Sequence, residues 1–255
     1  MMEFEFSTLS EYLGLVAEIP SMFNCHSSDL WYRGIKDENL KLIPGIIWRN
    51  ISTEREESII AEFLRYASNY STIRPKSAFE QYVLMQHYGL PTRLLDWSLS
   101  PLISLYFALE KEIENSSQRI VWVIDPREIN NKSIGFNAII SPNQFKLSMV
   151  ENYLPKYLRS STVGIPNTPV AIELPLMNQR VTAQKGVFTM HGYNTESIDE
   201  YYNKHKLNHI AKLKIRSESN RKKLLQDLYS IGFKEDDIYQ DLNSLSSRII
   251  REYDI

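Results

Sequence analysis

The sequence predicts an α+β fold, a single mixed domain with helices gathered in its N-terminal half and in its C-terminal tail. Its 255 residues are 43% hydrophobic and 24% charged, which is enough apolar material for one large core. Several segments place apolar residues at helical spacing. Between them lie short apolar runs rich in aromatic and β-branched residues, which are typical of buried strands.

The first predicted helix covers residues 7–19. Thr8 can cap it, and Glu11 three places later completes a capping box. We expect Pro20 to end this helix, because a proline ring removes a backbone donor and clashes with the preceding turn.

A buried strand is predicted over 30–35, an apolar and aromatic run in which glycine is the next-to-last residue. A helix over 53–70 begins with a capping box, and a second helix over 76–88 ends before Gly89. Residues 92–100 read as a loop or a short strand. Ser100 is then a cap for the following helix, which has proline at its first position and an apolar stripe that reaches Ile113.

The second half of the chain alternates strands, loops and helices. Further strands are predicted over 119–125, 170–174, 186–191 and 209–215, and further helices over 143–152, 219–231 and 235–252. Residues 159–168 read as an exposed loop. We expect an N-terminal helical segment (1–28), a core (29–192) and C-terminal strand and helices packed on that core (193–255).

Composition excludes several classes of protein. The chain has 29 basic and 31 acidic residues, so its net charge of −2 does not favour a general nucleic-acid binder. The single cysteine, Cys25, excludes an internal disulfide and a cysteine-based zinc site, and it favours a reducing compartment. No apolar run approaches the length of a membrane span, and the N-terminus does not resemble a signal peptide. A cytoplasmic protein without membrane contact is expected. No glycine pattern matches a dinucleotide fingerprint or a P-loop.

The segment 86–101 combines histidine, aromatic, charged and hydroxyl side chains between two predicted helices, where a binding site is often placed. Arg93 and Asp96 are close enough in sequence to pair. Ser100 precedes a helix whose N-terminus favours an anion. The alternative is structural: a buried network that fixes the fold, and a serine that only caps its helix.

Three motifs carry a resemblance to a known family. They are Tyr32-Arg33-Gly34, the segment from His87 to Pro101, and Gln184-x-Gly186-x-Phe188. On these motifs the chain resembles the FRG domain family. The order of the motifs is similar to that of arginine-type ADP-ribosyltransferases, which implies a remotely similar sheet core and a cleft for NAD.

The resemblance implies specific roles within that cleft. It implies catalytic work for Arg33, Ser98 and Gln184. Separately, the spacing of the five histidines does not favour a metal site. The residues expected to bind the NAD cofactor are Arg33, Gly34, His87, Tyr88, Arg93, Asp96, Trp97, Ser98 and Ser100. Gln184 departs from the transferase pattern, which has a carboxylate at that late position. Asp96 or Glu173 is then left to supply the negative charge.

Two functions remain open at this point. One is ADP-ribosyltransferase-like or NAD-glycohydrolase activity on NAD or another nucleotide, in bacterial toxin or phage-defence biology. The other is a non-catalytic FRG module that binds a protein or nucleic-acid partner. A basic run is where nucleic acid or a phosphorylated partner would bind: Lys212, Lys214, Arg216, Arg221, Lys222 and Lys223.

Overall fold

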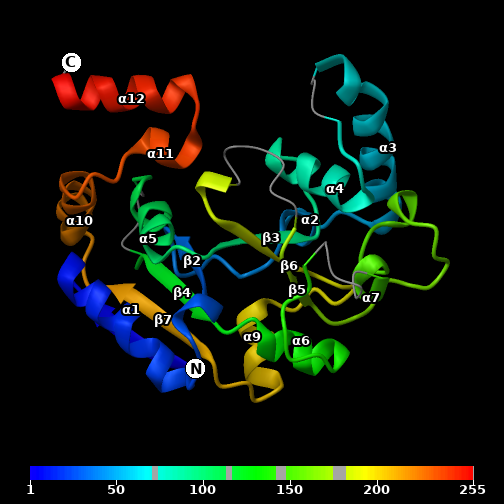
Figure 1. Cartoon of the computed structure of the whole chain (residues 1–255), viewed down its shortest axis with the longest axis horizontal. Helices are drawn as coiled ribbons and strands as arrows, with labels where there is room; N and C mark the ends of the chain where they lie inside the picture. The colour runs from blue at the N-terminus through cyan, green and yellow to red at the C-terminus, as the bar shows by residue number, and fades with distance from the viewer. Residues whose placement is uncertain (71–73, 113–116, 142–147, 175–181, 255) are drawn as a thin grey trace.

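The computed structural model describes residues 1–70, 74–112, 117–141, 148–174 and 182–254. Its strands form one sheet in the order β1-β7-β4-β2-β3-β6-β5. β1 runs parallel to β7, and every other neighbouring pair is antiparallel. With helices on this mixed sheet, the predicted α+β class is confirmed (Figure 1). The strands are β1 (Met2–Phe6), β2 (Trp31–Ile35), β3 (Leu94–Ser98), β4 (Ile120–Ile124), β5 (Val170–Ile172), β6 (Gly186–Met190) and β7 (Ile210–Ile215).

The helices lie against both faces and at one end of the sheet (Figure 1). They are α1 (Leu9–Phe23), α2 (Gly45–Trp48), α3 (Thr53–Tyr70), α4 (Ala78–His87), α5 (Pro101–Leu109), α6 (Arg127–Ile134), α7 (Ser148–Glu151), α9 (Ile198–Lys204), α10 (Ser219–Ser230), α11 (Glu235–Tyr239) and α12 (Leu242–Tyr253). Short 3₁₀ turns cover Ser27–Asp29 and Lys156–Leu158.

The predicted end of the first helix is wrong. α1 continues through Pro20 to Phe23 and ends at Asn24, which adopts the left-handed conformation. The last turn buries Ile19 and Phe23 completely. That apolar packing offsets the backbone hydrogen bond that the proline removes.

The predicted helix over 235–252 is two helices. Gln240 has a positive φ of 51° and ends α11, and the Asp241 side chain then caps α12 by accepting from the Ser244 amide at 2.7 Å. The sequence analysis also missed β1, α2, α6 and α9; the three helices are short and have weak periodicity, whereas β1 alternates apolar and acidic residues. Of the predicted helix 143–152, residues 148–151 are helical and 142–147 lie outside the described residues, as does Ile113.

The apolar core is divided unequally between the two faces of the sheet. One face carries a single cluster that includes Trp97 and Trp122. The other carries two clusters: the first lies beneath α1, α5 and α10, and the second beneath α3 and α4. The border between the two clusters on this second face runs between β2, which contributes Tyr32 to the first cluster, and β3, which contributes Leu94 to the second.

β2 and β3 are held together by the weakest link in the sheet. They share only the pair Tyr32↔Ser98, whereas β2 with β4 and β3 with β6 each share five pairs. Beyond Tyr32 the two strands separate, and the sheet opens at its centre. Nearby, α5 sits directly on β2, because a Cβ at Gly34 would lie 1.7 Å from the Ser104 carbonyl oxygen. Gly34 therefore serves the close approach of helix and strand.

Candidate functional site

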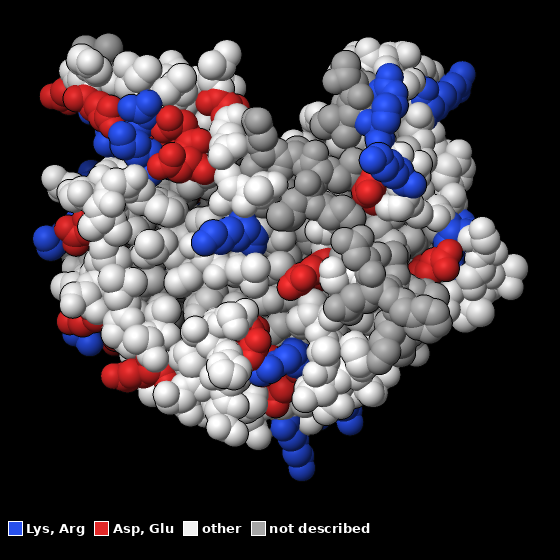
Figure 2. Space-filling model, viewed as in Figure 1, with Lys and Arg blue, Asp and Glu red and all other residues white. Residues whose placement is uncertain are grey.

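A cavity of about 500 Å³ lies where β2 and β3 separate. Its walls come from β2, β3, β6, α4, α5 and α11. Figure 2 shows this face of the molecule hollowed between the projections formed by α3 and by α12. The predicted site residues that line the cavity are Arg33, Gly34, His87, Asp96, Trp97, Ser98 and Gln184. Tyr88, Arg93 and Ser100 do not line it.

Arg33 occupies the opening between the strands. The backbone groups of the odd-numbered residues along β3 face β6. The Leu99 amide, just after the strand, continues this pattern by donating to the Lys185 carbonyl at 3.0 Å. The carbonyl of Asp96 therefore points toward β2, where it accepts a hydrogen bond from Arg33 Nη1. Arg33 has no ion pair within the described part of the chain, so its remaining donors are available to an anion. Its half-buried position lowers the pKa of the guanidinium by desolvation, an effect that the Asp96 charge opposes.

The Asp96 carboxylate is exposed to this cavity and is oriented by a short chain of hydrogen bonds. Gln86 Nε2 donates to Asp96 Oδ2 at 2.8 Å. Thr92 Oγ1 donates to Gln86 Oε1 at 2.5 Å and accepts from the Leu94 amide at 3.1 Å. This chain fixes the orientation of the Gln86 amide, and only Asp96 Oδ2 takes part in it among the described contacts. Glu173, the other carboxylate considered from sequence, does not line the cavity.

Ser98 and Ser100 hold the backbone that leads into α5. Ser98 Oγ donates to the Gln184 carbonyl at 2.7 Å and accepts from the Ser100 amide at 3.0 Å. Ser100 caps α5 by accepting from the Ile103 amide at 3.5 Å. The hydroxyl proton of Ser98 is thus already committed to the protein, and the structural interpretation of Ser100 as a cap is confirmed.

The aromatic wall differs from the one expected. Successive side chains of a strand alternate between faces, and the Trp97 ring packs in the cluster on the far face, with Nε1 bonded to Thr189 Oγ1 at 3.0 Å. Tyr88 is exposed and lines a separate apolar groove between α3 and α4. Besides Trp97, the aromatic residues that line the cavity are Tyr32, Phe107, Phe188 and Tyr239. Of these four, Tyr32 and Phe188 belong to motifs that the sequence analysis used.

Arg93 is part of the core. Its Nη2 and Nε bond to Glu56 Oε2 at 2.6 and 2.9 Å, and its Nη1 donates to the Gly192 carbonyl at 2.9 Å. The Tyr82 hydroxyl donates to the same carboxylate at 2.8 Å. The expected partner, Asp96, is bonded instead to Gln86 of α4, and its carboxylate takes no part in the contacts of Arg93. The structure favours the fold-fixing interpretation of Arg93.

His191 lies beside this buried network and gives a pH prediction. Burial lowers its pKa from 6.5 to about 3, with the Arg93 charge acting in the same direction and the backbone of Glu196 opposing. Below pH 6.5 the unfolded chain therefore binds a proton at this residue that the folded chain does not bind. Stability falls as the pH is lowered from 6.5 to about 3. Urea unfolding should therefore give a free energy of unfolding that is lower at about pH 4.5 than at about pH 7.5, with this residue contributing about 2–3 kcal/mol of the difference. His191→Asn should lose correspondingly less stability on acidification; equal losses in both proteins would contradict the assignment.

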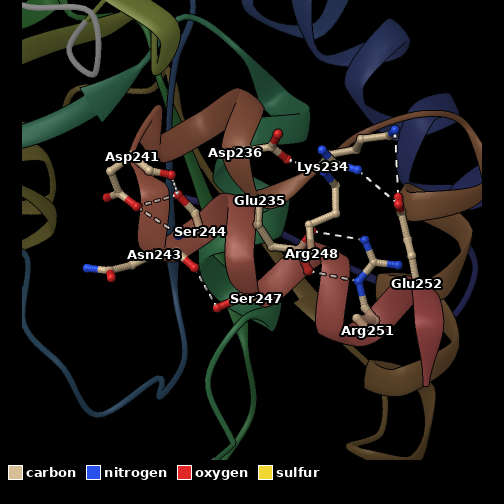
Figure 3. Close-up of polar contacts among 10 residues, drawn as sticks. All are labelled: Lys234, Glu235, Asp236, Asp241, Asn243, Ser244, Ser247, Arg248, Arg251 and Glu252. Atoms are coloured by element: carbon tan, nitrogen blue, oxygen red, sulfur yellow. Dashed lines mark hydrogen bonds and ion pairs between the residues drawn. The ribbon is translucent and has the colours of Figure 1, made fainter. Parts of the chain in front are cut away.

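The C-terminal helices form one wall of the cavity. Gln184 Nε2 donates to the Ile238 carbonyl at 3.3 Å, and the Tyr239 hydroxyl donates to the Glu110 carboxylate. α12 holds α11 in place through the pairs Arg251–Glu235 and Arg248–Asp236, at 2.8 and 2.7 Å (Figure 3). The sequence had no signal for this contact, because Tyr239 is far along the chain from every cavity motif.

Other chemical groups are less suited to a site. Burial, followed by the Asp125 charge, raises the pKa of the Cys25 thiol to about 11, which disfavours a thiolate nucleophile. Within the described ranges there is no group of three side chains able to hold a metal, and no helix there has the length and apolarity to cross a membrane.

The basic run is largely neutralised by neighbouring acids. Lys214 pairs with Glu3 at 2.7 Å and Arg216 with Glu5 at 3.4 Å, while Arg221 is buried against the Leu109 carbonyl. This weakens the run as a surface for nucleic acid, since such surfaces need uncompensated positive charge.

Comparison with known proteins gives one match. The family model of the FRG domain matches residues 28–117, which extend from just before β2 past the end of α5 and include Arg33 and Asp96. This match supports the FRG family. Gln184 and the C-terminal wall lie outside the matched residues. No curated protein and no solved structure matches the chain.

Proposed function

We propose that this FRG-domain chain binds NAD in the cavity between β2 and β3 and cleaves its bond between nicotinamide and ribose. ADP-ribose then passes to an acceptor group, as in ADP-ribosyltransferases, or to water. The observation that carries the proposal is the pair of opposite charges at one cavity: Arg33, with free donors, and the oriented carboxylate of Asp96. Pockets that bind small ligands have volumes of this order.

Each charge suits a different part of the substrate. The guanidinium of Arg33 has the fork geometry that binds phosphate oxygens, so it anchors the pyrophosphate. NAD supplies a glycosidic bond whose cleavage develops positive charge on the ribose while nicotinamide leaves with the bonding electrons. A carboxylate fixed in advance near that ribose stabilises the developing charge. Asp96 has that role here, because Gln86 already holds it in place.

Gln184 has a supporting role in this proposal. Its amide donates to the Ile238 carbonyl, and a neutral amide gives far less stabilisation of a cation than a carboxylate. Its carbonyl oxygen can still accept from a ribose hydroxyl. Asp96 on β3 therefore replaces the late-strand carboxylate of the transferases. A cytoplasmic role in bacterial toxin or phage-defence biology follows from the resemblance to the FRG family and is part of the proposal.

The test is release of nicotinamide from NAD by the purified protein. Arg33→Ala should abolish NAD binding and release, because it removes the anchor for the pyrophosphate. It should lower Tm by only a few degrees, because the side chain makes one hydrogen bond to the described residues, to the Asp96 carbonyl, worth about 1 kcal/mol. Binding by calorimetry and melting by circular dichroism check the two expectations.

Arg33→Lys is the matched control for charge. It should retain weak NAD binding but lose most of the activity, since an ammonium lacks the guanidinium fork. If the wild-type protein neither releases nicotinamide nor shows a thermal shift with NAD, the proposed activity is wrong.

A second candidate function has its own observation. The groove between α3 and α4 is strongly apolar and has a volume of about 780 Å³, with Tyr66, Tyr70 and Tyr88 exposed along it. Exposed apolar grooves of this kind are typical of protein-binding surfaces. A non-catalytic module would use this groove and leave the cavity without NAD. Binding of a protein partner that survives Arg33→Ala but not Tyr88→Ala would favour the non-catalytic function.

A further inference from the structure

Ser104 carries a buried hydroxyl that has no hydrogen-bond partner among the residues that the structure describes. It lies in α5, its residue is 1% exposed, and its Oγ makes no hydrogen bond. A serine inside a helix commonly bonds to the carbonyl four residues earlier, but here that carbonyl, on Ser100, accepts only from the Ser104 amide at 3.2 Å. Buried hydroxyls without partners are rare in folded proteins, because each costs the full desolvation of the group.

The position of this hydroxyl is set by the contact between α5 and β2. The absence of a side chain on Gly34 lets the Ser104 backbone reach the strand. Ser104 therefore lines the cavity beside Arg33, the residue that precedes Gly34. Phe107, one turn later, lines the same cavity, as does Lys111 just beyond the end of the helix. This wall of the cavity is therefore built from a serine, a phenylalanine and a lysine that follow one another along α5 and its end.

The hydroxyl of Ser98 differs from that of Ser104 in its hydrogen bonds. Both serines line the cavity, and the resemblance to transferases implied that Ser98 contacts the substrate. Ser98 Oγ, however, is committed to the Gln184 carbonyl and the Ser100 amide. Of the two hydroxyls, the one on Ser104 has its donor and both acceptor sites unused.

We propose that Ser104 is the serine that binds the nucleotide, through a ribose hydroxyl or the carboxamide of NAD. This inference rests on the proposed function, since it assigns a contact within the same NAD cavity. Because the Oγ is covered in the ligand-free protein, the proposal includes a turn of this side chain toward the cavity, where an incoming hydroxyl or amide satisfies it. Bound ligand then removes a cost that the free protein carries. Ser98 is then a structural residue that joins β3, β6 and α5.

The experiment compares Ser104→Ala with Ser98→Ala, first without ligand. Ser104→Ala should leave Tm unchanged or slightly raised, because it deletes an unsatisfied polar group. Ser98→Ala should lower Tm by about 3–8 °C, because it leaves a buried carbonyl and a buried amide unpaired. If both variants lose the same amount, the Ser104 hydroxyl has a partner in the fold and the inference is overturned.

The second part measures binding of NAD, ADP-ribose and nicotinamide by calorimetry. Ser104→Ala should weaken NAD binding about tenfold, the effect of one lost hydrogen bond in a desolvated site. A parallel loss for ADP-ribose assigns the contact to the ribose, and a loss confined to NAD and nicotinamide assigns it to the carboxamide. If wild type and Ser104→Ala bind NAD equally, the inference fails while the proposed function stands. If wild type binds none of the three, the proposed function fails, and the ligand-free melting data still report whether the hydroxyl is unused.

Discussion

Asp96→Asn should lower the rate of nicotinamide release by about 10²–10³-fold, the effect of removing one preorganised electrostatic group from an active site. The substitution keeps the shape of the side chain and its ability to accept from Gln86 Nε2, so Tm and NAD affinity should change little. The reason is that the negative charge contributes mainly when the ribose becomes cationic, in the transition state. A fall in kcat at nearly constant Kd for NAD, measured by nicotinamide release and calorimetry, would be the expected result.

Glu110→Gln is the matched control for this prediction. Glu110 is a second carboxylate at the cavity, but it accepts a hydrogen bond from the Tyr239 hydroxyl and thereby links α5 to α11. Its neutral isostere should retain most of the activity. If Glu110→Gln abolishes nicotinamide release and Asp96→Asn does not, the catalytic carboxylate has been assigned to the wrong strand.

Arg93→Ala should have the largest effect on stability. It leaves the carboxylate of Glu56 uncompensated at 1% exposure, and removing one partner of a buried ion pair costs about 3–5 kcal/mol. For a chain of this size, that corresponds to a fall in Tm of about 10 °C or more. Thermal and urea unfolding of Arg93→Ala beside Arg33→Ala, which removes an arginine at the cavity, measures the difference directly.

A double substitution tests whether the effect belongs to the pair. Glu56→Gln combined with Arg93→Met removes both charges from the interior, so the double variant should be more stable than Arg93→Ala alone. If Arg93→Ala melts within a few degrees of wild type, or if Arg33→Ala is the more damaging change, the division into a structural and a ligand-binding arginine is wrong.

The sequence predicted the major helices and most of the strands because their signals are local. Caps such as Thr8 and Ser100 and apolar stripes on α3 and α5 act within one or two turns, and the structure places those helices within a few residues of the expected bounds. β1 alternates apolar and acidic residues, which is itself the pattern of a half-buried strand, and this signal was overlooked. The strand forms only through its parallel pairing with β7, which lies some two hundred residues later in the chain.

For the candidate site, the sequence by itself determined which segment to examine. The motifs around Arg33 and Asp96 do meet at one cavity. Only the tertiary structure decided which of these side chains point into it. Strand alternation turns Trp97 away, while Glu56, supplied by α3, takes Arg93 into the core.

The same physical reason explains the residues that the sequence missed. Ser104, Phe107 and Tyr239 carry no motif, and their roles depend on how closely α5 approaches Gly34 and on where α11 ends. Local patterns specify elements and motifs, since they depend on neighbours within a few residues. Contacts between distant segments depend on how whole faces of those elements pack, which the folded chain alone determines.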